Sequence, residues 1–482
     1  MGITQIIGII LGVALLALIA VILIRTLMFK PEKKKELEIE EIEVDRDKVV
    51  RDMVDMIRLK TISDRDESLV DWNEFEKFKK LLEERFPLIH QSFTKTEIGR
   101  TGLLFKLEGK SSEKPTVCMS HYDVVPVEEE GWSKPAFEGI VEDGVIWGRG
   151  TLDTKGTFCA VMEATEALLM KGYVPENDLY LSFSGMEEIE GKDCPRIVEH
   201  LENMGVTPAM VLDEGGAVVE GVFPGVTKES AVVGISEKGG INIDLTIQSA
   251  GGHSSAPPAH SIMEQLSKAM NDIYNRPFKR ALTKPVKEMF DTLGRESTFL
   301  YRMIFANLWC FMPILDIICK KSGGELNALI RTTVAITKME GSKAYNVLPP
   351  NAKVGVNARI MCGETTETVL GEIKRIINND NIKVDMVSGW NPSICSDTNC
   401  EGWDKLKLAI NQTWSEAIVT PYLMLACSDS RHYCKITDKV YRFSTMKMSK
   451  EERGMIHGHD ERIPVDTLVK SVEFYTRFLK SI

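Results

Sequence analysis

The sequence predicts an α/β protein in which a mixed sheet flanked by helices is interrupted by an inserted α+β domain and preceded by one transmembrane helix. Short apolar runs alternate with helical patterns up to about residue 235, which is typical of a sheet covered by helices. From residue 236 strand patterns dominate, and after residue 359 the alternation of strands and helices returns. An uncharged apolar run near the amino terminus indicates the transmembrane helix.

Length, composition and charge limit the class of protein. A chain of 482 residues is larger than one hydrophobic core normally supports, so roughly two or three domains are expected. Its 43% apolar and 27% charged residues are ordinary for a globular enzyme that folds in water. The net charge of -11 has no compensating basic stripe, and such a surface repels a phosphate backbone. We therefore expect no nucleic acid partner.

The amino-terminal run covers residues 6–24 and contains no charged side chain. At 1.5 Å per residue it is long enough to cross a hydrocarbon core of about 30 Å. No basic segment precedes it, and it is longer than the apolar part of a usual signal peptide, so a single-pass, uncleaved anchor is expected. The charges that follow it, Arg25, Lys30 and residues 33–35, favour a cytoplasmic location for the rest of the chain. A sequon at Asn411 fits the opposite side, so the side remains open.

The expected elements of the main domain bring acidic residues and a histidine to strand ends. Helices are expected over residues 45–59 and 157–170, and short strands over residues 116–119, 179–183 and 209–212. These strands end just before His121, before Glu187 and Glu188, and before Asp213. Ligands of such sheets bind beyond the carboxyl ends of the strands.

The inserted segment predicts alternating strand residues over 241–247, a helix over 263–274 and further strands over 329–337. A helix over residues 366–377 follows, and we assign it to the main domain. Residues 303–315 are strongly apolar but short for a span, and they include Asn307 and Pro313. A buried or lid helix is the favoured interpretation, rather than a second crossing.

The candidate catalytic and metal-binding residues are histidines and carboxylates that lie at strand ends, beside glycines. Each of them alone is weak evidence, because a single histidine or a pair of glutamates is usually structural. Together they offer two imidazoles and several carboxylates, a set that suits zinc better than calcium or magnesium. The full set is His121, Asp153, Glu187, Glu188, Asp213 and His457.

A two-metal hydrolase needs a bridging carboxylate, and a further carboxylate that stays off the metals to act as a base. Glu187 and Glu188 can divide these duties if one faces the metal and the other faces substrate. Asp123 lies two residues after His121, on the same side of an extended segment. There it can orient the imidazole as a supporting carboxylate.

At these motifs the chain resembles the co-catalytic zinc metallopeptidases that include aminoacylase, carboxypeptidase S, dipeptidases and succinyl-diaminopimelate desuccinylase. The resemblance runs from about residue 45 to the end and is nearest the carboxypeptidase S and N-fatty-acyl-amino-acid hydrolase branch. It rests on Ser120-His121-Tyr122-Asp123-Val124-Val125-Pro126, Trp147-Gly148-Arg149-Gly150-Thr151-Leu152-Asp153-Thr154-Lys155-Gly156, Met186-Glu187-Glu188, Asp213-Glu214-Gly215-Gly216 and His457-Gly458-His459-Asp460-Glu461.

The resemblance implies two zinc ions per chain, for which cobalt or manganese can substitute. It implies the following roles: His121 and Asp213 on one ion, Glu188 and His457 on the other, Asp153 as the bridge and Glu187 as the general base. A shift of one residue exchanges Asp213 with Glu214, and we favour Asp213. His459 competes with His457, and the His-Gly-x-x-Glu pattern favours His457.

The inserted domain resembles the lid and dimerisation domain of this family. Its glycine-rich turn contains His253, which by resemblance reaches the active site of a partner subunit and stabilises the oxyanion. Asn346 and Arg359 look like the pair that grips polar groups of the substrate. Arg431 is a candidate ligand of a substrate carboxylate, and a buried structural ion pair is the alternative. The implied units are a membrane anchor (1–30), a charged linker (31–44), a catalytic domain (45–235 and 359–482) and a lid and dimerisation domain (236–358).

The expected reaction is hydrolysis of the amide bond of a small peptide or an N-acyl amino acid with a free carboxylate. One alternative is an N-fatty-acyl amino acid hydrolase or synthase, in which the apolar segment around Trp309 and Phe311 would line the acyl pocket. Another is a catalytically inactive membrane-bound binding protein on the same fold. The complete set of ligand residues argues against that alternative.

Overall fold

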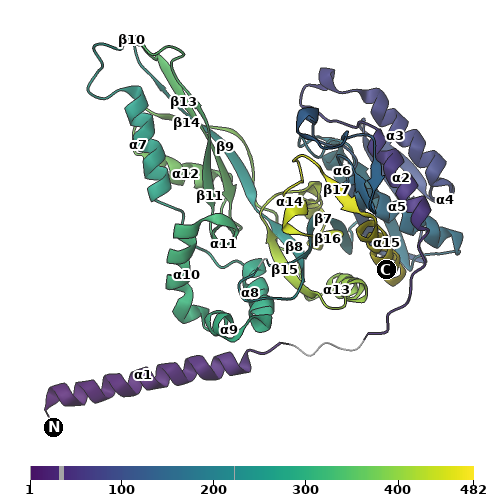
Figure 1. Cartoon of the computed structure of the whole chain (residues 1–482), viewed down its shortest axis with the longest axis horizontal. Coiled ribbons are helices and arrows are strands. Elements are labelled where there is room, and N and C mark those ends of the chain that lie inside the picture. The colour runs from purple at the N-terminus through teal and green to yellow at the C-terminus, as the bar shows by residue number, and fades with distance from the viewer. Residues whose placement is uncertain (1, 32–36, 222) are drawn as a thin grey trace.

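The computed structural model describes residues 2–31, 37–221 and 223–482, and its main sheet is the predicted mixed sheet (Figure 1). Eight strands run in the order β1-β2-β6-β3-β7-β16-β8-β15. The strands β3, β6, β7 and β16 pair in parallel, as do β8 and β15, while β1 and β2 pair antiparallel. Their bounds are β1 (Thr94–Ile98), β2 (Gly102–Leu107), β3 (Ser111–His121), β6 (Asn177–Ser184), β7 (Met210–Val219), β8 (Ser230–Glu237), β15 (Ile418–Met424) and β16 (Val440–Met448).

Helices cover both faces of this sheet because its strands carry apolar side chains on both sides. In β3, Cys118 faces the core formed with the larger group of helices, whereas Val117 and Met119 face the core formed with α6. The helices α2 and α5 match the expected helices over residues 45–59 and 157–170. The larger group is α2 (Arg46–Arg58), α3 (Trp72–Arg85), α4 (Pro87–Ser92), α5 (Lys155–Met170), α13 (Glu401–Thr413) and α15 (Val465–Ser481), and the opposite face carries α6 (Asp193–Asn203).

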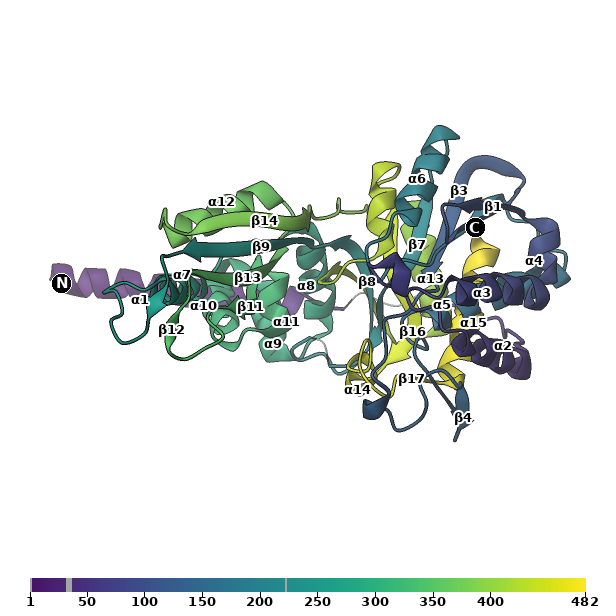
Figure 2. The same cartoon turned by 90° about the horizontal axis from the view of Figure 1, so that it is seen from above.

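A second, antiparallel sheet forms the inserted domain, which projects from the main sheet (Figures 1 and 2). Its strand order is β11-β13-β9-β14, and α7 and α12 share one apolar core with it. The elements are β9 (Gly239–Gln248), α7 (Ile262–Asn275), β11 (Thr333–Glu340), β13 (Asn351–Ile360), α12 (Thr366–Ile377) and β14 (Lys383–Trp390), and the distal end carries β10 (Gly252–His253) and β12 (Val347–Leu348).

The pairing of β14 with β9 corrects the boundary that the sequence predicted. The chain was expected to return to the main domain at residue 359, with the helix over 366–377 belonging there. Instead α12 buries Val369 and Ile373 against the inserted sheet, and β14 completes that sheet up to Trp390. The return to the main sheet follows Trp390. The expected strand over residues 329–337 begins only at Thr333, because α11 (Gly324–Leu329) precedes it.

Four helices lie between the two sheets, and of these α8 packs against β15 and α9 packs against the amino-terminal helix α1 (Ile3–Met28). They are α8 (Lys284–Glu296), α9 (Phe299–Ala306), α10 (Leu308–Ser322) and α11. The apolar segment over 303–315 is divided between α9 and α10, which are bent by 108° at Asn307. By length and composition α1 is apolar enough to cross a membrane.

The remaining elements form the loops around the carboxyl ends of the main strands. A three-stranded sheet in the order β17-β5-β4 joins residues in the first third of the chain to residues near its end. It consists of β4 (Ile140–Glu142), β5 (Val145–Trp147) and β17 (Arg462–Pro464), and the short helix α14 (Lys450–Arg453) precedes it. This small sheet brings the loop of Asp153 beside the loop of His457.

Candidate metal centre

Two histidine and glutamate pairs meet around one aspartate at the carboxyl ends of the main strands. His121 Nε2 lies 3.0 Å from Asp153 Oδ1 and 3.2 Å from Glu214 Oε1. His457 Nε2 lies 3.0 Å from Asp153 Oδ2 and 3.0 Å from Glu188 Oε2. Asp153 therefore directs one oxygen to each histidine, which is the arrangement of a carboxylate that bridges two metal ions.

These distances fit metal ligation. Zinc with tetrahedral bonds of about 2.0 Å holds its ligand atoms about 3.3 Å apart, close to the 3.0–3.2 Å found here. Within the described residues the buried Glu188 Oε1 has no hydrogen-bond partner, so this oxygen is available to a metal ion. The donors are imidazole nitrogens and carboxylate oxygens, which suit zinc and also cobalt or manganese.

The carboxylates of the metal centre are buried close together, so their negative charges favour protons or cations at the site. Burial raises the pKa of Glu188, and it raises the pKa of Glu214 to about 8. Burial lowers the pKa of His121, but Glu214, Asp123 and Asp153 outweigh it, so this pKa is raised well above its usual value. Hydrogen bonds with Asp153 and Glu188 raise the pKa of His457 to about 10. Two divalent cations would satisfy this demand.

Glu187 lies at the same site, and no hydrogen bond joins it to either histidine in the described structure. Its carboxylate lies within 4.8 Å of the ligand atoms of His121 and Glu214. Burial raises the pKa of Glu187 well above its usual value. This position leaves it free to accept and return a proton.

Asp123 contacts both the His121 imidazole and the backbone of Glu187 and Glu188, and so links these two parts of the site. Its Oδ1 accepts a hydrogen bond from the Glu187 backbone N–H (3.1 Å) and lies 3.3 Å from His121 Nδ1. Its Oδ2 accepts from the Glu188 N–H (3.2 Å) and from Ser63 Oγ (2.7 Å). The predicted contact with the imidazole is thus present. The role of Ser63 had no sequence signal beyond its place in the loop after the first helix.

The pair Arg149 and Glu461 positions Asp153, and sequence reasoning missed it. Glu461 is buried and accepts a hydrogen bond from Arg149 Nη1 (2.7 Å). Its Oε1 also accepts backbone N–H groups of Gly150 (3.1 Å), Leu152 (2.8 Å) and Asp153 (3.2 Å). Both residues stood in the quoted motifs, but only the fold shows that they join the two loops.

A bulge in β7 decides between Asp213 and Glu214. Asp213 pairs with Arg442 of β16, and the next pair is Gly216 with Phe443, so Glu214 and Gly215 are extra residues in the ladder. The bulge directs the Glu214 carboxylate to His121. The Asp213 Oδ2 instead accepts the backbone N–H of Ser430 at 3.1 Å. The sequence favoured Asp213 beside His121, whereas the geometry favours Glu214.

Glycine is required in this bulge, because the backbone of a neighbouring strand leaves no room for a side chain. Gly215 has a φ of +143°, and a Cβ on Gly216 would lie 1.8 Å from the carbonyl oxygen of Val232.

The two histidines near the carboxyl terminus differ in surroundings. The His459 ring packs against Gly131, where an added Cβ would lie 2.2 Å from its Nε2. Only His457 meets Asp153 and Glu188.

The structure divides the other candidate residues into two groups. His253 lies in β10 at the distal end of the inserted domain, where Asn346 accepts the N–H of Ser254 (Figure 1). Arg359 lies at the opposite end of β13, and a strand of ten residues spans about 30 Å. The guanidinium groups of Arg359 and Arg431 lie 5.9 and 5.7 Å from the Trp390 ring centre. Arg359 thus groups with Arg431, and Asn346 with His253.

A largely apolar cavity of about 710 Å³ is lined in part by sequence neighbours of two residues of the metal centre. Gly215, next to Glu214, and Ile456, next to His457, lie in its wall. Its apolar lining includes Phe223, Met289, Leu293, Leu326, Leu329 and Tyr422. Trp309 and Phe311, which were expected to line the acyl pocket of a lipid substrate, are not among the residues that line this cavity.

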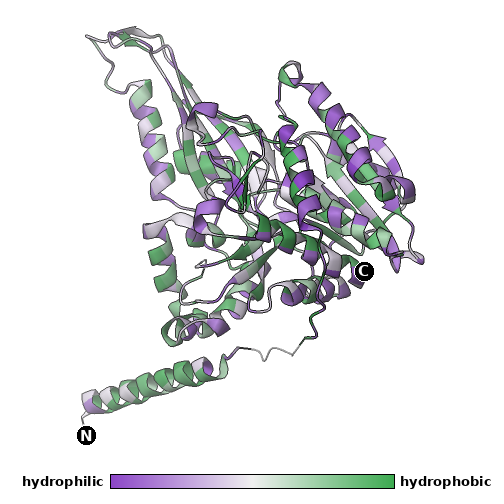
Figure 3. Cartoon of the chain, turned by 45° about the vertical axis from the view of Figure 1, so that its right-hand side comes forward, coloured by the Kyte–Doolittle hydropathy of each residue, from purple (hydrophilic) through white to green (hydrophobic). Residues whose placement is uncertain are grey.

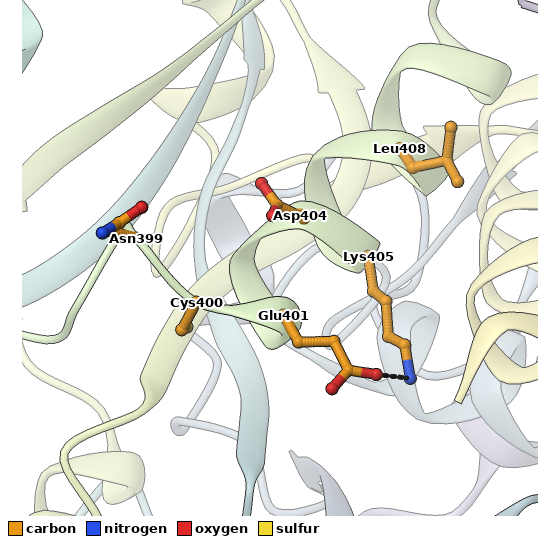
Figure 4. Close-up of a pocket in the computed structure, with 6 residues that line it drawn as sticks. All are labelled: Asn399, Cys400, Glu401, Asp404, Lys405 and Leu408. Carbon is orange, nitrogen blue, oxygen red and sulfur yellow. Dashed lines mark ion pairs between the residues drawn. The ribbon is translucent and has the colours of Figure 1, made fainter.

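A second hollow, of about 440 Å³, lies at the start of α13 (Figure 4). Glu401 in it pairs with Lys405 at 2.9 Å and with Lys114 at 2.7 Å. None of its lining residues belongs to the metal centre, and we assign it no role.

The protein has an α/β fold with a mixed sheet, and two histidine and glutamate pairs lie around one aspartate at the ends of its strands. These features define the class of protein as a metal-dependent hydrolase with an inserted domain. The profile of the peptidase family M20/M25/M40 matches residues 117–481. The chain belongs to this family, which confirms the resemblance drawn from the motifs. It is therefore an enzyme, and the alternative of an inactive binding protein is not supported.

Known relatives lie on the expected branch. The chain is 34% identical over 414 residues to the probable carboxypeptidase S-like 2 of Dictyostelium discoideum, covering 85% of this chain and 79% of that protein. It is 33% identical over 480 residues to the N-fatty-acyl-amino acid synthase/hydrolase PM20D1 of Xenopus tropicalis, covering 97% and 93%. The fold matches an M20 family metallo-carboxypeptidase of Sulfolobus solfataricus with a TM-score of 0.68 and 17% identity, over 90% and 98% of the two chains.

Proposed function

We propose that this protein uses two metal ions, zinc by preference, to hydrolyse the amide bond of N-acyl amino acids or small peptides with a free carboxylate. The observation that carries this proposal is Asp153, whose two oxygens face two different histidines. The proposed ligands are His121 and Glu214 for one ion, His457 and Glu188 for the other, and Asp153 for both. Glu214 here replaces Asp213 of the sequence-based assignment.

The ions would lower the pKa of a water molecule at the site and polarise the scissile carbonyl. Glu187 takes a proton from that water as its oxygen bonds to the carbonyl carbon, and then delivers the proton to the leaving nitrogen. The carbon–nitrogen bond breaks, giving a carboxylic acid and an amine. Asp123 fixes the Glu187 backbone during both transfers, and Glu461 fixes Asp153 by accepting a hydrogen bond from the Asp153 backbone N–H.

The assignment of Glu214 as a metal ligand is tested by comparing two substitutions that replace a carboxylate with an amide. Glu214→Gln should lower the metal content from two ions to about one per chain, because an amide is a much poorer zinc ligand than a carboxylate. Asp213→Asn should keep both ions, since an amide oxygen still accepts the Ser430 N–H. Mass spectrometry of the purified proteins measures the metal. If only Asp213→Asn loses an ion, Asp213 is the ligand.

For the substrate carboxylate we propose Arg359 and Arg431. Their guanidinium groups both lie near Trp390, and Arg431 Nη1 donates to the Ser428 carbonyl at 2.9 Å, which holds it in place. A guanidinium binds a carboxylate through two parallel hydrogen bonds. Two relatives are named as a probable carboxypeptidase S-like protein and an N-fatty-acyl-amino acid synthase/hydrolase, and both names fit a substrate or product with an amino acid carboxylate.

The apolar cavity favours a long acyl chain as one substrate class. Its volume of about 710 Å³ falls within the range of about 300–1,000 Å³ of ligand pockets. Its wall includes Gly215 and Ile456, the sequence neighbours of two proposed ligands, and it extends between α8 and α11, so we place the acyl group of a substrate held at the metal centre in it. Each methylene buried there contributes about 0.8 kcal/mol.

Filling this cavity should discriminate between long and short acyl groups. Leu293→Trp, which excludes at least two methylenes, should lower kcat/KM for an N-oleoyl amino acid about tenfold and leave the N-acetyl analogue nearly unchanged. Leu408→Trp, in the hollow of Figure 4, is the matched control. An equal loss for both substrates, or no loss for either, would rule out the cavity as the acyl site.

Two further proposals concern the setting of the enzyme. We propose that α1 anchors the chain in a membrane through residues 6–24, and the charges after it favour a cytoplasmic enzyme.

We also propose a homodimer through the inserted domain. The exposed His253 and Asn346 lie at the end of that domain that is far from the main sheet (Figure 1), so they would serve the metal centre of a second copy.

A further inference from the structure

An apolar surface on α9 and α10 has no partner within the described residues. Six large side chains on these two helices are each between 53% and 61% exposed. Figure 3 shows these helices as green ribbon at the edge of the molecule, near α1. We call this surface the α9–α10 face, and it consists of Phe299, Leu300, Trp309, Ile314, Ile317 and Ile318.

The buried side of α10 shows that this exposure is not that of an ordinary surface helix. Met312, Asp316 and Cys319 are buried at helical spacing. Asp316 forms ion pairs with Arg331 and with Arg280 (3.1 Å). The helix thus turns its one carboxylate inward and its isoleucines outward, the reverse of the pattern for a face covered by water. Lys320 also pairs with Asp316 (3.1 Å), and the exposed Lys321 beside it adds positive charge at the end of the face.

Contacts with α1 fix where the α9–α10 face lies along the length of that helix. Arg25 donates from Nε and Nη2 to the Ala306 carbonyl at 3.2 and 3.1 Å. Asn307 Nδ2 donates to the Ile22 carbonyl at 3.2 Å and to Thr26 Oγ1 at 3.3 Å. Arg25 is the first charged side chain of the sequence, directly after the apolar run. The bend between α9 and α10 therefore lies level with the end of that run.

The direction of α1 places the face against the same boundary. Residues 2–21 are exposed, and the 19 residues 6–24 extend about 28 Å, close to the thickness of a hydrocarbon core. In Figure 1, α1 passes below α9 and α10, its amino-terminal end extends past the rest of the molecule, as Figure 2 also shows, and α10 runs across its direction. A helix that crosses the line of a spanning helix at its charged end lies along the membrane surface.

We propose that the α9–α10 face rests on a phospholipid bilayer as an interfacial hairpin beside the spanning helix α1. Its apolar side chains enter the acyl boundary, and Lys321 faces the phosphates. This inference concerns where the enzyme sits, and it rests on the proposed anchor rather than on the proposed reaction. Phe305 and Met312, on the inner side of the hairpin, share a core with Phe223 and Leu293 of the apolar cavity. The cavity wall thus lies against a bilayer-bound hairpin.

Trp309 allows a direct test with the full chain. The protein is reconstituted into phosphatidylcholine vesicles with and without bromine on the acyl chains, and tryptophan emission is compared. We expect quenching by the brominated lipid, and we expect Trp309→Phe to remove at least half of it. Trp147→Phe, in β5, should remove little.

A double substitution to aspartate tests whether the α9–α10 face contacts the bilayer. Ile317→Asp with Ile318→Asp should halve the quenching of Trp309, whereas Leu69→Asp, at another exposed leucine, should not. Hydrolysis of a short N-acyl amino acid should be unchanged in both, which separates this inference from the proposed reaction. Thermal unfolding reports whether the aspartates disturb folding, and Trp309→Phe stands independently of them.

Protease protection of residues 6–24 in the same vesicles reports on the anchor separately. A protected α1 with no quenching of Trp309 would refute the interfacial hairpin. An unprotected α1 would remove its basis. If emission from Trp309 instead shifts with protein concentration in detergent without lipid, a second copy covers the face, and that result also overturns the proposal.

Discussion

Glu187→Gln should lower kcat by between about 100-fold and 10,000-fold, the range for loss of a positioned proton-transfer group, while two metal ions remain bound. The glutamine is nearly the same size but cannot take a proton from water. Glu187 has no hydrogen bond with His121 or His457 in the described structure, and the proposed ligand pairs are complete without it. The metal centre should therefore survive the change.

Steady-state hydrolysis of an N-acetyl amino acid, together with metal analysis of the same sample, checks this result. Glu190→Gln is a suitable control, because it changes a nearby glutamate that forms a long ion pair, at 3.8 Å, with the exposed Arg65. Glu190→Gln should retain nearly full activity. Activity within threefold of the unmodified enzyme in Glu187→Gln would show that another residue transfers the proton.

Asp153→Ala should have the harsher effect, with both metal ions lost and no measurable hydrolysis. Asp153 approaches both histidines at 3.0 Å, so its removal takes one ligand from each site at once. It also leaves His121 near Glu214, and His457 near Glu188, without the shared oxygen atoms that join the two sites.

Metal content and thermal unfolding of Asp153→Ala are measured beside Asp438→Ala, a change at an exposed aspartate that pairs with the adjacent Lys439. The control should keep two ions and full activity. Two ions retained by Asp153→Ala would refute the bridge, whatever the activity.

The sequence predicted the mixed sheet and the group of metal-binding residues because both depend on local patterns. Short apolar runs ended at His121 and before Glu187, and parallel strands bring such ends together at one edge. The boundary of the inserted domain could not be predicted in this way. A helix followed by a strand, as in α12 and β14, has the same pattern in either domain, and only the pairing of β14 with β9 assigns it.

The choice between Asp213 and Glu214 also depends on long-range structure. Neighbouring residues of a regular strand face opposite sides, and only the bulge against β16 shows which carboxylate meets His121. The link between Arg149 and Glu461 joins residues 312 positions apart. The motifs contained both, yet no pattern in the sequence indicated that they touch.

Anomalous diffraction at the zinc edge, from crystals of the unmodified enzyme, tests the metal centre most directly. It should show two peaks about 3.5–4 Å apart, one beside His121 and Glu214 and the other beside His457 and Glu188, with an Asp153 oxygen on each. A single peak, or two peaks that do not share Asp153, would contradict the two-metal centre proposed for this enzyme.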